Sequence, residues 1–107
     1  MIISTDLDKN YLAPNNVIAG VIKRVDLEVY DEAKAVADGT FKGGEISVGL
    51  KEGTDTLSPS TKKMVPAAVY QVATDLQQMI VDGTVVPPST PDEFQSFSLP
   101  KVNWPQG

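Results

Sequence analysis

Two aspartates, Asp6 and Asp8, stand one residue apart at the end of a short apolar run near the amino terminus, M-I-I-S-T. Carboxylates in this D-x-D arrangement can attack phosphorus and transfer a proton, can help to hold a metal ion, or can accept hydrogen bonds from a sugar diol. Each of these kinds of site needs different partners further along the chain.

A phosphate-transferring site is the sharpest of the three hypotheses. In haloacid-dehalogenase-like hydrolases, D-x-D follows an apolar first strand, and Asp6 would then be the nucleophile and Asp8 the general acid and base. That family also needs an acidic pair for magnesium after a later strand. The candidate strand over residues 45–50 is followed instead by Lys51-Glu52-Gly53. We therefore expect no catalytic residues and no enzyme.

A calcium site is disfavoured by the residues that follow. Asp6, Asp8 and Asn10 have the alternate spacing of oxygen ligands that begins a calcium loop, but the loop needs a glycine two residues later and a glutamate further on. Leu12 stands at the first of these positions, and residues 15–17 contain no glutamate. The sequence also has no cysteine and no histidine. We therefore expect neither a metal ion nor another cofactor.

The composition narrows the classes of partner. The chain has 107 residues, with nine basic and fourteen acidic side chains and a net charge of -5. Its positive charges are spread out, so we expect neither nucleic acid nor an anionic membrane surface as a partner. No apolar run approaches the ~18 residues of a membrane span. The sequence as written has no signal peptide and no lipid-anchor cysteine, which predicts a cytoplasmic location.

The pattern of the first half predicts an α/β fold. The run before Asp6 reads as a first strand, and residues 17–22 are continuously apolar, as in a strand of a parallel sheet. A helix is expected from a cap at Asp26 to about Asp38, with Gly39 as its carboxyl-terminal stop. Residues 45–50 alternate between apolar and polar, which predicts a third strand, and residues 51–63 read as a loop or irregular edge.

The second half contains the clearest helix. Pro66 suits a first turn, Gly83 suits the carboxyl-terminal stop, and one apolar stripe lies between them: Val69, Val72, Ala73, Leu76, Met79 and Ile80. The order strand, strand, helix, strand, helix predicts a small, largely parallel sheet flanked by helices. Five of the eight prolines lie from Pro87 onward, so we expect neither a helix nor a central strand there. Five large apolar residues in that tail should lie against a surface: Phe94, Phe97, Leu99, Val102 and Trp104.

A sugar-binding site remains, because ligands of open α/β sheets bind outside the carboxyl ends of the strands, where Asp6 would stand. The motifs that follow D-x-D are A-P at 13–14, K-R-V-D at 23–26, G-T-F-K-G-G at 39–44, G-L-K at 49–51, and V-P at 65–66 and 86–87. In this order and spacing, residues 3–91 closely resemble the carboxyl-terminal part of the basic membrane protein family. Its members are purine-nucleoside-binding lipoproteins of ABC importers.

The resemblance implies the fold of a type I periplasmic binding protein, in which two α/β lobes close on a nucleoside. It implies that Asp6 holds the ribose hydroxyls and that Lys23, at the end of the next strand, approaches the same cleft. It also implies an extracytoplasmic location. Ser4 stands where the family has glycine, Lys9 where it has glutamine, and Ala19-Gly20 where it has threonine and serine.

Family members are several times longer than this chain. The first hypothesis is therefore a non-catalytic fragment or truncated relative of a nucleoside-binding protein, with residues 1–91 as part of a lobe and residues 92–107 as an extended tail. The alternative is a stand-alone module without ligand binding that associates with itself through the tail or an exposed sheet edge.

Overall fold

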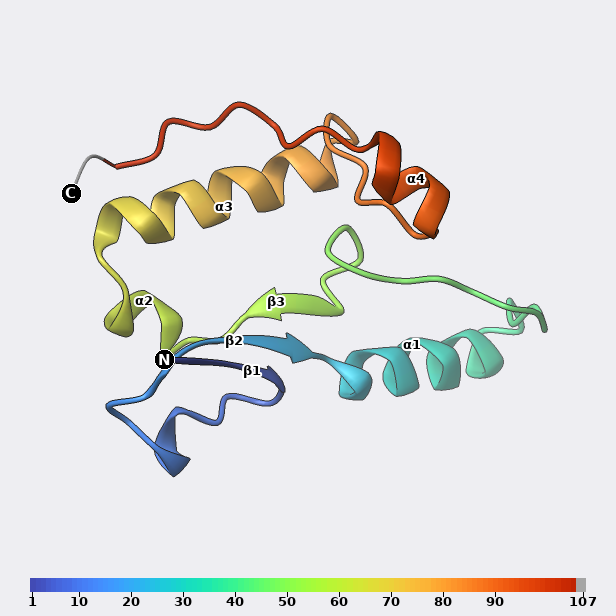
Figure 1. The fold of residues 1–107 in the computed structure, drawn as a ribbon. Helices are drawn as coiled ribbons and strands as arrows, with labels where there is room; N and C mark the ends of the chain where they lie inside the picture. Colours follow the sequence, from blue (N-terminus) through green and yellow to red (C-terminus); the bar gives the residue numbers. More distant parts are fainter. Residues whose placement is uncertain (106–107) are drawn as a thin grey trace. The chain divides into compact units, whose positions relative to one another are not determined.

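A computed structural model describes residues 1–105 of the chain (Figure 1). These residues form two compact units, the first over residues 1–64 and the second from residue 65 onward. The first unit holds the sheet and all the residues of the predicted site. The last two residues of the predicted tail, 106 and 107, lie outside the described part.

The sheet of the first unit has three strands in the order β1-β2-β3: β1 (Ile2–Asp6), β2 (Val17–Lys23) and β3 (Asp55–Leu57). β1 and β2 run parallel, with Asp6 opposite Ile22, whereas β3 runs antiparallel to β2. The predicted α/β class with a small sheet and helices is confirmed. The β-branched residues of the first two strands favour this extended pairing.

The third strand lies outside the segment that the alternating pattern predicted. Residues 45–50 are not a strand, and on the apolar side of the pattern Ile46 is 61% and Val48 39% exposed. The edge of β2 is paired instead by β3, within the segment read as a loop or irregular edge. Backbone hydrogen bonds from Arg24 N to the Thr54 carbonyl, 2.6 Å, and from Ser58 N to the Gly20 carbonyl, 2.8 Å, extend that pairing.

Helix α1 (Val25–Ala37) follows β2 directly and extends away from the end of the sheet (Figure 1). Asp26 does not cap it, contrary to the prediction. Arg24 is the N-cap, and Asp26 lies in the first turn, where its carboxylate accepts hydrogen bonds from the Arg24 guanidinium. Gly39 has a φ of 69° after this helix and Gly83 a φ of 75° after the later one, so both predicted glycine stops are confirmed.

The centre of the first unit is lined by hydroxyl groups more than by hydrocarbon. Its buried residues are Ser4, Val17, Gly20, Thr54, Ser58 and Thr61. Thr61 begins the short helix α2 (Thr61–Met64), shares a 2.8 Å hydrogen bond with the Ser58 hydroxyl, and accepts one from Gly20 N. Gly20 has no room for a side chain, because a Cβ there would lie 2.8 Å from the Ser4 Oγ.

The second unit contains α3 (Ala67–Val81) and α4 (Pro91–Ser96). Pro66 is the N-cap of α3, and Val72 of its apolar stripe is buried. The expectation that no helix forms after Pro87 is wrong. Pro91 stands at the start of α4, where proline is tolerated, and Thr90 and Glu93 form a reciprocal capping box.

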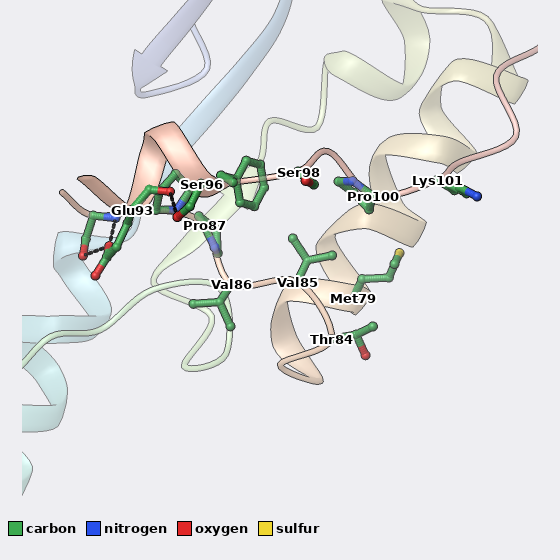
Figure 2. A pocket seen from close by; sticks show the side chains of 13 residues that line it. Met79, Thr84, Val85, Val86, Pro87, Glu93, Ser96, Ser98, Pro100 and Lys101 are labelled. Carbon is green, nitrogen blue, oxygen red and sulfur yellow. Dashed lines mark hydrogen bonds between the residues drawn. The ribbon is translucent and has the colours of Figure 1, made fainter. Parts of the chain in front are cut away.

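In the described part of the tail, three of the five large apolar side chains are exposed, whereas Phe97 and Val102 are half-buried. Phe94 is 70%, Leu99 84% and Trp104 65% exposed. A wide hollow of about 810 Å³ in this unit is lined by Met79, by residues 84–89, and by residues of α4 and the segment after it, Phe97 included (Figure 2). The prediction that the tail lies against a surface, its own or a partner's, stays a prediction, as does the boundary at 91/92.

Candidate functional site

Asp6 ends β1 in an unusual backbone turn. Its φ is 74°, and within residues 1–105 it is the one residue other than glycine with a positive φ. The next amide, Leu7 N, donates a 3.0 Å hydrogen bond back to the carbonyl of Thr5. A bond from residue i+2 to residue i around a positive φ is the rare and strained form of the γ-turn. The turn stops the strand and presents the Asp6 carboxylate beyond its end.

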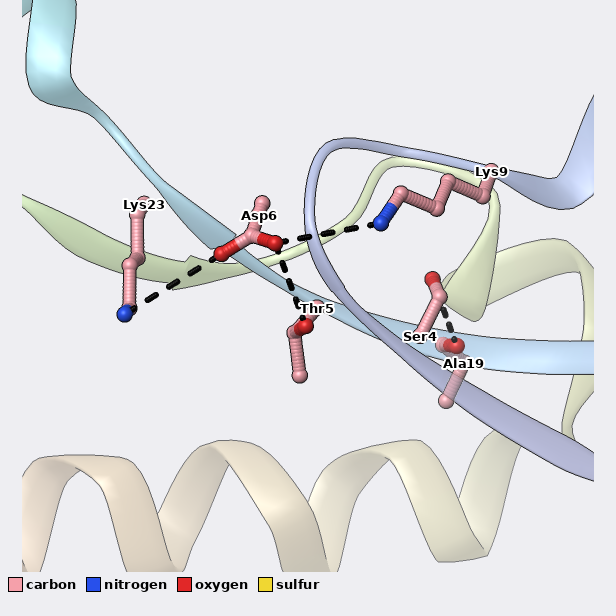
Figure 3. A network of polar contacts seen from close by, with 6 residues as sticks. All are labelled: Ser4, Thr5, Asp6, Lys9, Ala19 and Lys23. Atoms are coloured by element: carbon pink, nitrogen blue, oxygen red, sulfur yellow. Dashed lines mark hydrogen bonds and ion pairs between the residues drawn. The ribbon is translucent and has the colours of Figure 1, made fainter.

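The structure brings together the two residues predicted for the site. Because β1 and β2 are parallel, their carboxyl ends meet at one edge of the sheet, and Lys23 is the last residue of β2. The Lys23 Nζ lies 4.0 Å from the Asp6 Oδ1 (Figure 3). Both side chains are more than half exposed, 58% for Asp6 and 63% for Lys23. The carboxylate can therefore exchange its present partners for a ligand.

A second lysine, which the sequence reasoning treated only as a departure from the family pattern, completes this group. Lys9 Nζ lies 3.8 Å from the Asp6 Oδ2, and the Thr5 hydroxyl donates to the same oxygen at 3.4 Å (Figure 3). The spacing of three residues between Asp6 and Lys9 was the available signal. The group of Asp6, Lys9 and Lys23 offers one acceptor carboxylate and two flexible cationic donors.

The second aspartate of D-x-D points to a different partner. Asp8 accepts a 2.6 Å hydrogen bond from the Ser60 hydroxyl and a 3.0 Å bond from the Ser60 backbone N–H. The bond from the Ser60 hydroxyl is the main reason why the pKa of the Asp8 carboxyl is lowered, and the charge of Lys63 acts in the same direction. This side chain is half-buried. Asp8 is therefore a structural acceptor and does not share the Asp6 group.

Two departures from the family pattern lie next to each other in the sheet. Ser4 and Gly20 are register partners on adjacent strands, and a Cβ on Gly20 would lie 2.8 Å from the Ser4 Oγ. The family pattern has glycine and serine at these positions, in the opposite order. In this chain the Ser4 hydroxyl occupies the space beside Gly20, with its Oγ donating to the Ala19 carbonyl at 3.4 Å.

Other kinds of site find no support in the described residues. Among residues 1–105, no group of three or more His, Cys, Asp or Glu side chains could hold a metal ion. Over the same residues, no helix is long and apolar enough to cross a membrane. The hollow of the second unit is wide and contains neither of the predicted site residues.

Comparisons with known proteins agree on one family. A family model described as "ABC transporter substrate-binding protein PnrA-like" matches residues 1–90. Basic membrane protein D of Borreliella burgdorferi (strain JD1) is 32% identical over 105 residues, which are 95% of this chain and 31% of that protein. Basic membrane protein A of Borreliella afzelii is 34% identical over 98 residues, or 90% and 30% of the two chains.

Two further matches extend the comparison. An uncharacterized lipoprotein of Pyrococcus abyssi is 49% identical over 47 residues, which are 44% of this chain and 12% of that protein. The crystal structure of an ABC transporter system solute-binding protein from Aeropyrum pernix K1 is similar with a TM-score of 0.63 and 26% identity. That match covers 88% of this chain and 35% of the other. The chain thus spans about a third of the length of the basic membrane proteins it matches, 31% and 30% in the two cases.

Proposed function

Because the chain belongs to the family of PnrA-like ABC transporter substrate-binding proteins, we propose that it provides one wall of a purine-nucleoside-binding site. Asp6 and Lys23 are the ligand-contacting residues of this proposal. The observation that supports it most strongly is the exposed Asp6 carboxylate at the carboxyl end of β1, with the Lys23 Nζ 4.0 Å away at the end of the parallel neighbour. This edge of an open sheet is where ligands of α/β proteins bind.

The chemistry of the carboxylate fits a ribose. Two vicinal hydroxyls present two O–H donors side by side, and the two oxygens of an ionised carboxylate accept them as charge-assisted hydrogen bonds. Lys23 and Lys9 hold the carboxylate while the site is empty, at separations of 4.0 and 3.8 Å. Exposed ion pairs of this kind contribute little to stability, so the ligand displaces them at small cost.

The wider role follows from the family. We propose a non-catalytic role in an extracytoplasmic protein that delivers a nucleoside to an ABC transporter, since two of the matching relatives from Pyrococcus are named as lipoproteins. In this proposal the chain corresponds to one part of the longer relatives. The remaining contacts with the nucleoside, to the base above all, come from the other part.

Calorimetric titration tests the role of Asp6. Guanosine or inosine is titrated into the chain at millimolar concentration, in the original sequence, in Asp6→Asn, and in Asp31→Asn as a control at an exposed aspartate of α1. Asparagine tolerates a positive φ, so Asp6→Asn removes the charge and keeps the turn. We expect the affinity to fall about tenfold or more in Asp6→Asn and to stay unchanged in Asp31→Asn. Heat that Asp6→Asn leaves unchanged would contradict the proposal.

A second candidate function, self-association without a ligand, is favoured by exposed apolar surface. β1 is an edge strand whose Ile3 is 68% exposed, and Leu99 in the tail is 84% exposed. Unpaired strand edges and large apolar patches are sites of association. Light scattering at several concentrations distinguishes the candidates. A dimer that is lost in Ile3→Lys supports association through the edge, and a monomer at all concentrations contradicts it.

A further inference from the structure

We propose that Asp8 is a positioning residue, which holds the strained turn that presents the Asp6 carboxylate. The inference rests on the proposed function for the identity of the ligand. Its mechanism rests on the geometry of the D-x-D segment and of its contacts with Ser60. It assigns different roles to the two aspartates: Asp6 meets the ligand, and Asp8 fixes the backbone around it.

The backbone at Asp6 needs support from both sides. A residue other than glycine at a φ of 74° is in a sparsely populated conformation, which persists only where the surrounding structure imposes it. Before Asp6, the parallel pairing of β1 with β2 supplies this support up to the pair Asp6 and Ile22. After Asp6 the pairing has ended, and the chain turns away from the sheet. The support on that side has to come from a different contact.

Asp8 makes the contact that is required, two residues after the strained position. Its carboxylate accepts three hydrogen bonds: from the Ser60 hydroxyl at 2.6 Å, from Ser60 N at 3.0 Å and from Asn10 N at 3.2 Å. Ser60 is 52 residues away along the chain. The bonds to Ser60 therefore attach the segment after Asp6 to a different part of the first unit, and the bond from Asn10 N tightens the segment itself.

The partner is itself held in place. Ser60 lies between β3 and α2, and its Oγ lies 3.1 Å from the Oγ of the buried Ser58. Ser58 is fixed to β2 by the bond from its amide to the Gly20 carbonyl at 2.8 Å, and to Thr61 by the hydroxyl pair at 2.8 Å. The Asp8–Ser60 contact thus connects the Asp6 turn to β2 through β3 and α2.

The same geometry explains why Asp8 is not a second ligand residue. Both of its carboxylate oxygens accept hydrogen bonds from the protein, and the side chain is half-buried. Asp6, in contrast, has only long contacts to exposed side chains at 3.4 to 4.0 Å. A ligand can replace the partners of Asp6, whereas at Asp8 it would have to displace three hydrogen bonds within the protein.

Nuclear magnetic resonance reads the turn directly, because a positive φ brings the amide proton of a residue close to its own Hα. We expect a strong nuclear Overhauser effect between these two protons of Asp6 in the original chain. It should weaken in Asp8→Ala and in the milder Ser60→Ala. Ser60→Thr keeps the hydroxyl and the backbone N–H and should retain the effect. Glu93→Ala, which removes a carboxylate with the same kind of serine contacts in the second unit, is the control.

Guanosine affinity gives the functional readout. It should fall about tenfold in Asp8→Ala and Ser60→Ala, recover in Ser60→Thr and stay unchanged in Glu93→Ala. An Asp6 signal that stays strong in Asp8→Ala and Ser60→Ala would overturn the inference. So would a signal lost only together with the contacts between β1 and β2, because Asp8 would then be a general structural residue. Absence of guanosine binding in the original chain would count against the proposed function alone, since the Asp6 signal decides the positioning role without a ligand.

Discussion

Asp8 in the first unit and Glu93 in the second make the same kind of contact with one serine each. Asp8 accepts hydrogen bonds from the amide and hydroxyl of Ser60, and Glu93 accepts both from Ser89, at 2.7 and 2.9 Å. The Asp8 pair joins residues 52 apart in a half-buried position, whereas the Glu93 pair joins residues four apart on an exposed helix end. The two contacts are therefore alike in chemistry, but only the one at Asp8 joins distant parts of the chain.

The difference lies in what each pair holds. Glu93 completes a capping box that any short helix can form from its own residues. Asp8 depends on the packing of β2, β3 and α2, and in return it fixes the turn at the candidate site. The Asp8–Ser60 contact, the remote pair, couples the turn at the candidate site to the stability of the first unit, whereas the Glu93–Ser89 contact, the local pair, concerns one helix end.

The largest effect should come from the packing on which the remote pair depends. In Gly20→Ala the new Cβ would lie 2.8 Å from the Ser4 Oγ and 3.1 Å from the Ser58 Oγ. We expect the free energy of unfolding of the first unit to fall by about 1–3 kcal/mol, as in other overpacked cores. Chemical denaturation measures it, with Gly43→Ala as the control because no atom lies within 4 Å of that site.

The double variant Ser4→Gly, Gly20→Ala sharpens this result. It removes the closest clash, so part of the lost stability should return. A double variant no more stable than Gly20→Ala would show that the contact with Ser4 is not the cause. The α4 capping box should be unchanged in all these chains.

The next effect separates the two carboxylates by hydrogen exchange. In Asp8→Ala, protection should fall about tenfold or more at the Ser60 amide and also at Gly20 and Ser58, because the remote pair supports their packing. In Glu93→Ala, the loss should be confined to the amides of Ser89 and Thr90. If Asp8→Ala lowered the protection of the Ser60 amide alone, the Asp8–Ser60 contact would be as local as the Glu93–Ser89 contact.

Acidification should weaken both contacts, with a wide effect on stability at Asp8 and a local one at Glu93. Hydrogen bonds from Ser60 lower the pKa of Asp8, and those from Ser89, its backbone N–H first, lower the pKa of Glu93. Because each folded pKa lies below the unfolded one, the stabilisation is present above the unfolded pKa and is lost as the pH falls through the folded pKa. Below about pH 4, the original chain should therefore lose more stability than Asp8→Asn. Equal acid sensitivity of the two chains in denaturation at pH 3 and pH 6 would contradict the role of Asp8.

The smallest effect is expected at the local pair. Thr90→Ala removes the acceptor of the Glu93 amide, at 3.2 Å, and should cost about 1 kcal/mol of α4 stability. Carbon chemical shifts of residues 91–96 measure the helix population, with Thr90→Ser as the conservative control. Chemical shifts in the first unit should not change, and any change there would contradict the local character of the Glu93 contact.

The helices and strands with a clear apolar periodicity could be predicted from the sequence, and so could the edge of the sheet where the site residues meet. β1, β2 and α3 follow from their apolar patterns, and the parallel strands bring Asp6 and Lys23 together as expected. β3 has three residues in a polar segment, too short to show a period. The alternation over residues 45–50 is clear, but no strand forms there and Ile46 and Val48 are exposed.

Two other features were missed for different reasons. The T-P-D-E signature of α4 is present in the sequence, and proline, which disfavours the interior of a helix, is tolerated in the first turn that Pro91 occupies. The Asp8–Ser60 contact could not be predicted, because a hydrogen bond between residues 52 apart depends on the packed unit and leaves no local pattern.

Residue-resolved titration with guanosine is the most direct test that the Asp6 turn is one wall of a nucleoside site. The amide signals of Asp6, Leu7 and Lys23 are followed in the original chain and in Asp6→Asn, with free guanine as the ligand without ribose. We expect saturable shifts at these residues with guanosine, much smaller shifts with guanine, and loss of the guanosine response in Asp6→Asn. Unmoved signals at Asp6 and Lys23 under saturating guanosine, or an equal response in Asp6→Asn, would contradict it.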